Sequence, residues 1–244
     1  MIEEMINTRT VVDVFIWWGQ SNEFIGNITG EAAFTLNAAP TNCLRYTDFD
    51  GEVLPMKFPN MDFLLNGNLY YNKEYSFATE IKRGYYYKWA ENGSSLIVGW
   101  TPNSVNRNRL WNGASILINY LKKQGFEVRV HFGQDQWEAD AGNSYANYTA
   151  AMVEFYGDFE EEIHPITSYL FAKPNVNSTS YNQNTEDQIV PAFNDFAASK
   201  KYAIVVDYDD IVAGLDSGLH YTGLQNIERG IRMANAWKSF GFNQ

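Results

Sequence analysis

Short apolar runs recur along the chain, separated by longer segments in which apolar and polar residues mix. The first run covers residues 11–17 (VVDVFIW), and similar runs cover residues 95–100 (SLIVGW), 126–132, 166–172 and 202–207. Runs of this length, rich in β-branched and aromatic residues, are typical of strands that are buried on both faces of a parallel sheet. The pattern therefore predicts five buried strands.

The segments between these runs have the spacing of helices. Residues 107–123 place apolar side chains at i, i+4, i+7, i+8 and i+11, and Gly125 follows as a stop signal. Helices are also predicted over residues 141–159, 185–200 and 222–240. Alternating strands and helices require crossover connections. The predicted fold class is therefore α/β: a three-layer, flavodoxin-like α/β/α sandwich with a mostly parallel five-stranded sheet.

Residues 29–75 do not follow this alternation. They are rich in Asn, Gly and Pro, which predicts long loops or a small β excursion over the sheet edge. The chain of 244 residues contains no internal repeat and no low-complexity linker, and its length suits one large domain. We therefore predict a single domain over residues 1–244, with a loop-rich insertion around residues 29–75.

Charge and cysteine content narrow the classes of function. The chain has 29 acidic and 18 basic residues, for a net charge of −11. Binding to nucleic acid or to an anionic membrane needs a basic face, so neither is expected as a partner. The single cysteine, Cys43, rules out a disulfide within the chain and a Cys-based zinc cluster. The first residues lack the apolar region of a signal peptide. We therefore expect a cytoplasmic protein, or a virion-associated one if it is phage-encoded.

In an open parallel sheet, ligands bind at the carboxyl ends of the strands, so the residues after each predicted strand are candidates for chemistry. Gly19, Gln20, Ser21 and Asn22 follow the first strand. A serine on a tight turn at this point can act as a nucleophile, and its own N–H can bind an oxyanion. The alternative is that Ser21 only caps the next helix, since Ser and Asn are favoured there.

Two further polar segments follow strands. Residues 216–221 (DSGLHY) come after the last strand, where His220 is a candidate general base with Asp216 as its orienting acid. The alternative is an ordinary solvated loop histidine. Residues 134–140 (QDQWEAD) offer the amide of Gln136 and the carboxylate of Glu138 at the same edge. Here the alternative is a polar loop before an acidic helix start.

Taken together, these segments resemble the SGNH hydrolases, most closely the branch with sialate O-acetylesterases and carbohydrate esterase family 6. VFIWWGQSNEFIG is similar to that branch's GQSN block, QWEADA to its QGESDA block, and GLHYTGLQNIERG to its closing histidine block. The resemblance spans about residues 10–240, with the blocks in the family's order. It implies a serine esterase that hydrolyses acyl esters, chiefly O-acetyl, on a carbohydrate, with no metal or organic cofactor.

The same resemblance assigns roles to particular residues. Ser21 would be the nucleophile and His220 the base. The oxyanion and substrate would be held by residues around these two, namely Gly19, Gln20, Asn22, Asn72, Gln136 and Glu138. Asn72 is included because the family's second glycine donor falls near residues 71–75, where this chain has no glycine but has an asparagine that tolerates a left-handed turn.

The sequence also departs from the family. Trp137 stands where the family has glycine, and Ser217 stands where it has the aspartate three residues before the histidine, so that Asp216 lies one residue further back. These departures leave a second interpretation open. The chain would then be a catalytically degenerate SGNH domain that binds carbohydrate or builds a virion structure.

Aromatic residues make up 16% of the chain and could stack on sugar rings. For Trp17 and Trp100, which lie in strand-like runs, burial in the core is the favoured alternative. A composition rich in Asn and Tyr and poor in Lys is common in phage surface proteins. The expected partner is an acetylated carbohydrate or another small ester, and oligomer formation or virion assembly stays open.

Overall fold

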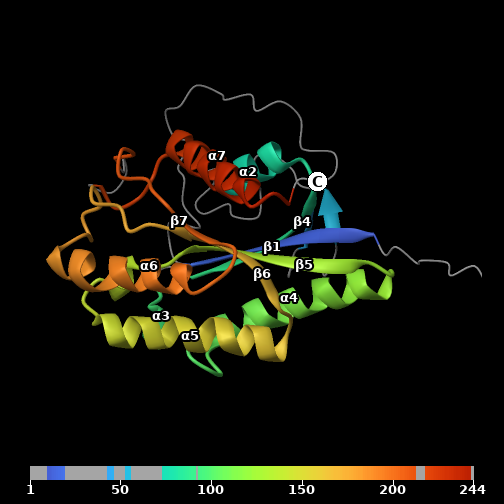
Figure 1. Ribbon diagram of the computed structural model, residues 1–244, viewed down its shortest axis with the longest axis horizontal. Coiled ribbons are helices and arrows are strands. Elements are labelled where there is room, and N and C mark those ends of the chain that lie inside the picture. The colour runs from blue at the N-terminus through green and yellow to red at the C-terminus, as the bar shows by residue number, and fades with distance from the viewer. Residues whose placement is uncertain are drawn as a thin grey trace, which may run out of the picture.

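The computed structural model describes residues 10–19, 43–46, 53–55, 73–91, 93–212 and 218–242. These residues form a three-layer α/β/α arrangement around a mostly parallel sheet, which confirms the predicted fold class (Figure 1). The strands are β1 (Val11–Gly19), β2 (Cys43–Tyr46), β3 (Val53–Pro55), β4 (Gly84–Ala90), β5 (Glu127–Asp135), β6 (Ile166–Ala172) and β7 (Ala203–Val206). Their order is β3-β2-β4-β1-β5-β6-β7, and only the β2–β3 pair is antiparallel.

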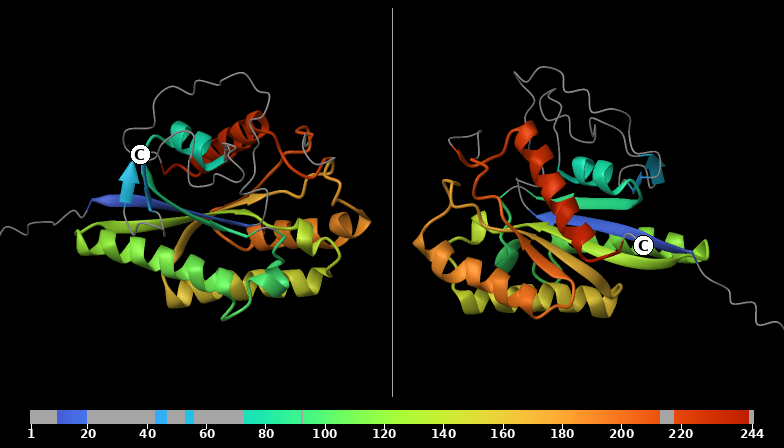
Figure 2. Two further views of the ribbon diagram at one scale, coloured as in Figure 1. Left: turned by 180° about the vertical axis from the view of Figure 1, so that it is seen from behind. Right: turned by 45° about the horizontal axis from the view of Figure 1, so that its top comes forward.

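Helices cover both faces of the sheet. One face carries α3 (Leu96–Gly99), α4 (Val105–Lys123), α5 (Tyr145–Glu162) and α6 (Val190–Ala198), the last preceded by a π-helical turn, η2 (Thr185–Ile189). The other face carries α2 (Lys73–Ile81) and α7 (Gly223–Ser239), which lie side by side (Figures 1 and 2). A short 3₁₀ turn, η1 (Glu138–Asp140), follows β5. None of the helices in these ranges is long and apolar enough to cross a membrane.

One predicted strand is wrong. Residues 95–100 contain the short helix α3, and the strand that pairs with β1 on that side is β4, at residues 84–90. The helix begins where the Ser95 hydroxyl accepts a hydrogen bond from the N–H of Val98, while Asp140 accepts one from the N–H of Leu96. Such capping favours a helix over an extended chain. The other four predicted strands and the four predicted helices are present, with ends shifted by a few residues.

β1 is buried on both faces, as its continuous apolar run predicts. On the α5 side, the Trp18 ring stacks on Phe155 and meets Trp100 edge to face. On the α2 side, the Trp17 ring packs edge to face against Phe77. Trp17 is 0% exposed and Trp100 is 1% exposed, so the core interpretation is confirmed for both.

The described part of the segment at residues 29–75 extends the edge of the sheet. β2 pairs with β4 in parallel, and β3 returns antiparallel to β2. This matches the β excursion expected there.

Two glycines allow close approaches between neighbouring elements of the fold. A Cβ on Gly133 would lie 2.2 Å from the Trp17 ring, and a Cβ on Gly230 would lie 2.1 Å from the carbonyl oxygen of Lys73. Gly230 belongs to α7 and Lys73 to α2, so the absence of a side chain at Gly230 sets how closely these helices pack. In contrast, a Cβ on Gly157 in α5 would meet nothing within 4 Å.

Replacing Gly230 with alanine is therefore expected to force α2 and α7 apart. Overpacking of this kind costs about 1–3 kcal/mol of unfolding free energy. The matched control is Gly157→Ala, which should gain up to about 1 kcal/mol from helix propensity alone. Urea unfolding of both variants measures the difference. Equal stability of the two variants would contradict the close packing of α2 on α7.

Candidate active site

The carboxyl ends of three strands meet at one edge of the sheet. Gly19, the last residue of β1, pairs with Ala90 at the end of β4 and with Asp135 at the end of β5. The N–H of Glu91 also donates to the Gly19 carbonyl, at 3.1 Å. The segments that follow β1, β4 and β5 therefore start side by side. We call this edge the carboxyl rim.

Several predicted site residues lie outside the described residues. These are Gln20, Ser21, Asn22, Asn72 and Asp216, together with Ser217. Gly19, Gln136, Glu138 and His220 are described.

Gln136 follows β5 and is fully buried (0% exposed). Its side-chain Nε2 donates to the Ser94 carbonyl at 2.5 Å and to the Asp140 carboxylate at 3.2 Å. These two bonds engage both amide protons. Gln136 thus ties the end of β5 to the turn after β4, and its direct donation to an oxyanion stays a prediction.

Asp140 is the centre of this network, although no motif in the sequence assigns it a role. Its carboxylate accepts hydrogen bonds from the Ser95 hydroxyl (2.5 Å), the Leu96 N–H (2.7 Å) and the Asn143 amide (3.1 Å), besides the bond from Gln136. Burial raises the pKa of Asp140, and these donors oppose that rise. The signal that could have revealed it is the spacing from Gln136, since i and i+4 residues around a helical turn face one another.

The turn after β4 also contains a candidate oxyanion donor that no sequence motif indicates. Gly93 has a left-handed φ of 63°, and its N–H makes no hydrogen bond with any described residue. The next residue, Ser94, donates through its hydroxyl to the Glu91 carbonyl at 2.8 Å and accepts from the Trp100 indole at 2.9 Å. These bonds, with the one from Gln136, fix the turn at the carboxyl rim.

His220 is held in place just before α7. It is 8% exposed, which argues against the solvated-loop alternative. Two residues later Thr222 caps the helix: its N–H donates to the Gln225 side chain at 2.8 Å, and its hydroxyl accepts from the Gln225 N–H at 3.3 Å. The hydroxyl of Tyr221, next to His220, accepts a hydrogen bond from Asn175 at 2.7 Å.

A buried ionic cluster connects this histidine segment to the rest of the rim. Asp135 pairs through one carboxylate oxygen with Lys73 (2.7 Å) and with Arg229, and all three side chains are at most 1% exposed. Burial would raise the pKa of Asp135, but the positive charges of Arg229 and Lys73 hold it below its usual value. The Arg229 guanidinium also lies 3.9 Å from the centre of the Tyr221 ring. We call Lys73, Asp135 and Arg229 the clamp.

Glu138 lies near the same segment. Burial raises the pKa of Tyr221 to about 12, and the negative charges of Asp135 and Glu138 add to this rise, while Arg229 opposes it. Through Arg229, the clamp links Asp135, next to Gln136, with Tyr221, next to His220.

Trp137, the residue after Gln136, is 2% exposed. Its side chain is buried in the core and meets the Tyr181 ring edge to face, with ring centres 6.2 Å apart.

Within the described ranges, no three His, Cys, Asp or Glu side chains gather as metal ligands would.

Two solved structures share this fold. A protein from Arabidopsis thaliana superposes with a TM-score of 0.69 at 18% identity, covering 93% of this chain and 98% of that one. A carbohydrate acetylesterase from Xanthomonas citri superposes with a TM-score of 0.61 at 15% identity, covering 95% of this chain and 57% of that one. This chain thus spans little more than half of the acetylesterase. No protein-family model and no curated protein matches the sequence. At these identities the similarity establishes the fold.

Removal of one clamp residue should lower the free energy of unfolding strongly. Arg229→Met would leave Lys73 alone with Asp135 and remove the cation over Tyr221, and breaking a buried ion pair costs about 3–5 kcal/mol. The control is Arg232→Met on the same helix. The partners of Arg232, Asp210 and Glu228, are exposed, so this variant should lose far less free energy of unfolding. Urea unfolding compares the two variants, and similar losses would contradict a structural role for the clamp.

Proposed function

We propose that the protein is a serine esterase that removes O-acyl groups, chiefly O-acetyl, from a carbohydrate. The observation that carries the proposal is the arrangement at the carboxyl rim. β1 ends between the Gly93–Ser94 turn and Gln136, and Ser21 lies two residues beyond the end of β1. The segment with His220 is fixed to the same rim through Tyr221 and the clamp.

In the first step, the Ser21 hydroxyl oxygen attacks the ester carbonyl carbon while His220 takes the hydroxyl proton. The carbonyl oxygen becomes an oxyanion, which needs donors that are already in place. The N–H groups of Ser21 and Gly93 would supply them, with Gly93 taking the part that the sequence analysis gave to the backbone near Asn72. Gln136 would hold the Gly93–Ser94 turn in position, through its bond to the Ser94 carbonyl.

In the second step, the bond between the carbonyl carbon and the sugar oxygen breaks, and His220 gives its proton to the leaving alcohol. Water then attacks the acyl-enzyme as His220 accepts a proton from it. Collapse of this second intermediate releases the carboxylic acid, and the proton returns to Ser21. Each cycle consumes one ester and one water.

The proposed substrate class follows from two observations. The Xanthomonas neighbour with this fold is a carbohydrate acetylesterase. The chain is also rich in aromatic residues, and Trp89, one residue before the end of β4 at the carboxyl rim, is only partly buried. Half-buried aromatic rings suit stacking on a sugar.

A second candidate function is carbohydrate binding or virion assembly without catalysis. The observation that favours it is the engagement of both Gln136 amide protons within the protein, together with Ser217 in place of the family's aspartate. Hydrolysis of an acetyl ester by the wild type, compared with Ser21→Ala, separates the two candidates.

Ser21→Ala is expected to abolish hydrolysis of a small acetyl ester and of an acetylated sugar, because no other group replaces the nucleophile. Thermal stability should stay almost unchanged. The control is Ser115→Ala on α4, which should retain full activity. If Ser21 were only a helix cap, its removal would cost about 1 kcal/mol, lower the melting temperature by about 2–4 °C and leave activity in place.

The acid partner of His220 is proposed to be Asp216. A carboxylate that accepts the imidazole N–H fixes the tautomer and stabilises the imidazolium. Two rival carboxylates have other partners: Asp209 pairs with Lys173, and Asp210 makes a two-pronged pair with Arg232.

Asp216→Asn should therefore lower kcat by about three to four orders of magnitude with little change in stability. Ser217→Ala, at the neighbouring position, should change kcat only slightly. Steady-state kinetics of the two variants gives the comparison. If Asp216→Asn kept the wild-type kcat, Asp216 would not be the acid, and the proposed site would consist of Ser21 and His220 alone.

A further inference from the structure

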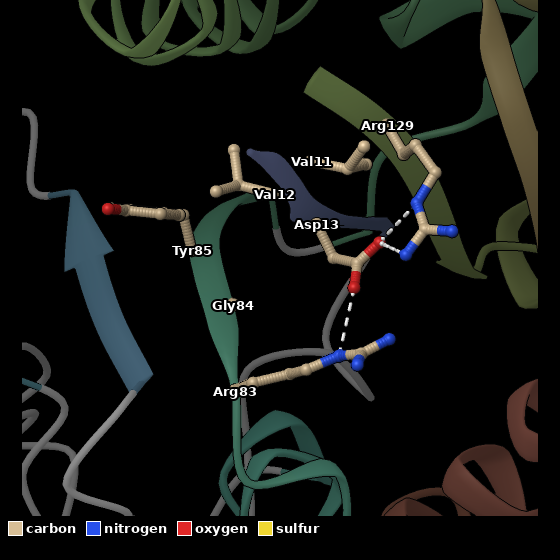
Figure 3. Close-up of a pocket in the computed structure, with 7 residues that line it drawn as sticks. All are labelled: Val11, Val12, Asp13, Arg83, Gly84, Tyr85 and Arg129. Atoms are coloured by element: carbon tan, nitrogen blue, oxygen red, sulfur yellow. Dashed lines mark hydrogen bonds and ion pairs between the residues drawn. The ribbon is translucent and has the colours of Figure 1, made fainter. Parts of the chain in front are cut away.

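A pocket lies at the opposite edge of the sheet, where β1, β4 and β5 begin (Figure 3). Its volume is about 340 Å³. It is lined by Val11, Val12, Asp13, Arg83, Gly84, Tyr85 and Arg129. The nine residues of β1 separate it from the carboxyl rim by about 26 Å. It is therefore distinct from the proposed esterase site.

Two guanidinium groups in this pocket share one carboxylate. Arg129 approaches Asp13 Oδ1 through Nε at 2.8 Å and through Nη2 at 2.7 Å. Arg83 approaches Oδ2 through Nε at 3.0 Å. Figure 3 shows the two arginines on either side of the Asp13 carboxylate. The imidazole Nε2 of His131 is also 3.0 Å from Oδ1.

The charges in this cluster do not cancel. Burial would raise the pKa of Asp13, but the hydrogen bond with His131 and the positive charges of Arg129 and Arg83 hold it below its usual value, so Asp13 is ionised at neutral pH. Burial lowers the pKa of His131, which is therefore neutral. Two guanidinium groups against one carboxylate leave one net positive charge.

The two arginines also keep unused donors. Nη1 of Arg83 and Nη1 of Arg129 make no hydrogen bond with any described residue, and the side chains are 38% and 27% exposed. The contact of Arg83 Nε with Asp13 lacks the alignment of a hydrogen bond. Arg83 Nη2 donates to the Phe242 carbonyl at 2.6 Å, which holds the guanidinium in place.

The backbone that presents Arg83 is unusual on both sides. Lys82 has a φ of 62° and Gly84 has a φ of 108°. The left-handed region is unfavourable for lysine, and a Cβ on Gly84 would lie 2.7 Å from the Phe15 ring. Lys82 ends α2 in the left-handed conformation common at helix C-termini, so Arg83 is held between the end of α2 and the start of β4.

We propose that this pocket binds a small organic carboxylate of about the size of a sugar acid. The planar fork of a guanidinium matches a carboxylate, and one net positive charge suits a monoanion. The volume corresponds to roughly ten water-sized groups. Val11, which lies on the same face of β1 as Asp13, offers apolar surface to the uncharged part of the ligand. This proposal does not depend on the esterase function.

The test is isothermal titration of the full chain with D-glucuronate at 0.15 M salt, with neutral D-glucose as the matched ligand. We expect saturable binding of glucuronate and none of glucose. Arg129→Gln and Arg83→Gln should each weaken glucuronate binding at least tenfold. The control variant is Lys82→Asn, which removes an exposed neighbouring positive charge outside the pocket and keeps a residue that tolerates a left-handed φ. It should change the affinity less than twofold.

Asp13→Asn distinguishes a binding site from a purely structural cluster. Loss of the competing carboxylate frees donors on both arginines, so glucuronate should bind about tenfold more tightly. A structural cluster would lose stability without gaining affinity. This variant also keeps the proposal testable if the arginine variants fail to fold. Absence of saturable glucuronate binding by wild type, equal binding of glucose, binding of inorganic phosphate in place of glucuronate, or unchanged affinity in Arg129→Gln would each overturn the proposal.

Discussion

The pairing of one buried carboxylate with two buried cations governs the geometry of the carboxyl rim. A charge removed from water is tolerated only when its partners are present and correctly placed. Asp135 finds its partners in Lys73 at the start of α2 and Arg229 in the middle of α7. Both helices must therefore close onto the end of β5, which they do because Gly230 lets α7 approach the α2 backbone. The contacts that neutralise the buried Asp135 carboxylate are therefore the same contacts that bring α2 and α7 to the carboxyl rim.

The clamp also explains why chemistry can be placed at this rim. Gln136 directly follows Asp135, and the Tyr221 ring lies under the Arg229 guanidinium. The pairing of Asp135 with Arg229 therefore positions both the Gln136 segment and the His220 segment. The opposite end of β1 carries a second shared carboxylate, Asp13. Between the two ends, the side chains of residues 14–18 are almost fully buried. Asp13 helps to fix the register of β1, because a one-residue slip would carry its carboxylate to the other face of the sheet, away from Arg129 and Arg83.

Sequence patterns were sufficient for most of the fold but failed around residues 84–100, and the failure has a physical cause. Lys88 reads as a surface residue, yet it is buried within β4 because Glu74 of α2 pairs with it at 2.6 Å. Residues 95–100 read as a strand, yet Asp140, more than 40 residues further on, binds the Ser95 hydroxyl and the Leu96 N–H and starts a helix. Local periodicity carries no information about partners this far along the chain.

The same error affected the site. Gln136 and His220 could be selected because the strands before them were predicted correctly, whereas Gly93 was overlooked because β4, which ends just before it, was not. With β4 in place, a left-handed glycine is seen to follow the strand beside β1, where its N–H can take the part first assigned to the backbone near Asn72. For the proposed esterase, the decisive residue is the acid that would orient His220: the residue three positions before the histidine is Ser217, so the proposal assigns this part to Asp216, one position further back.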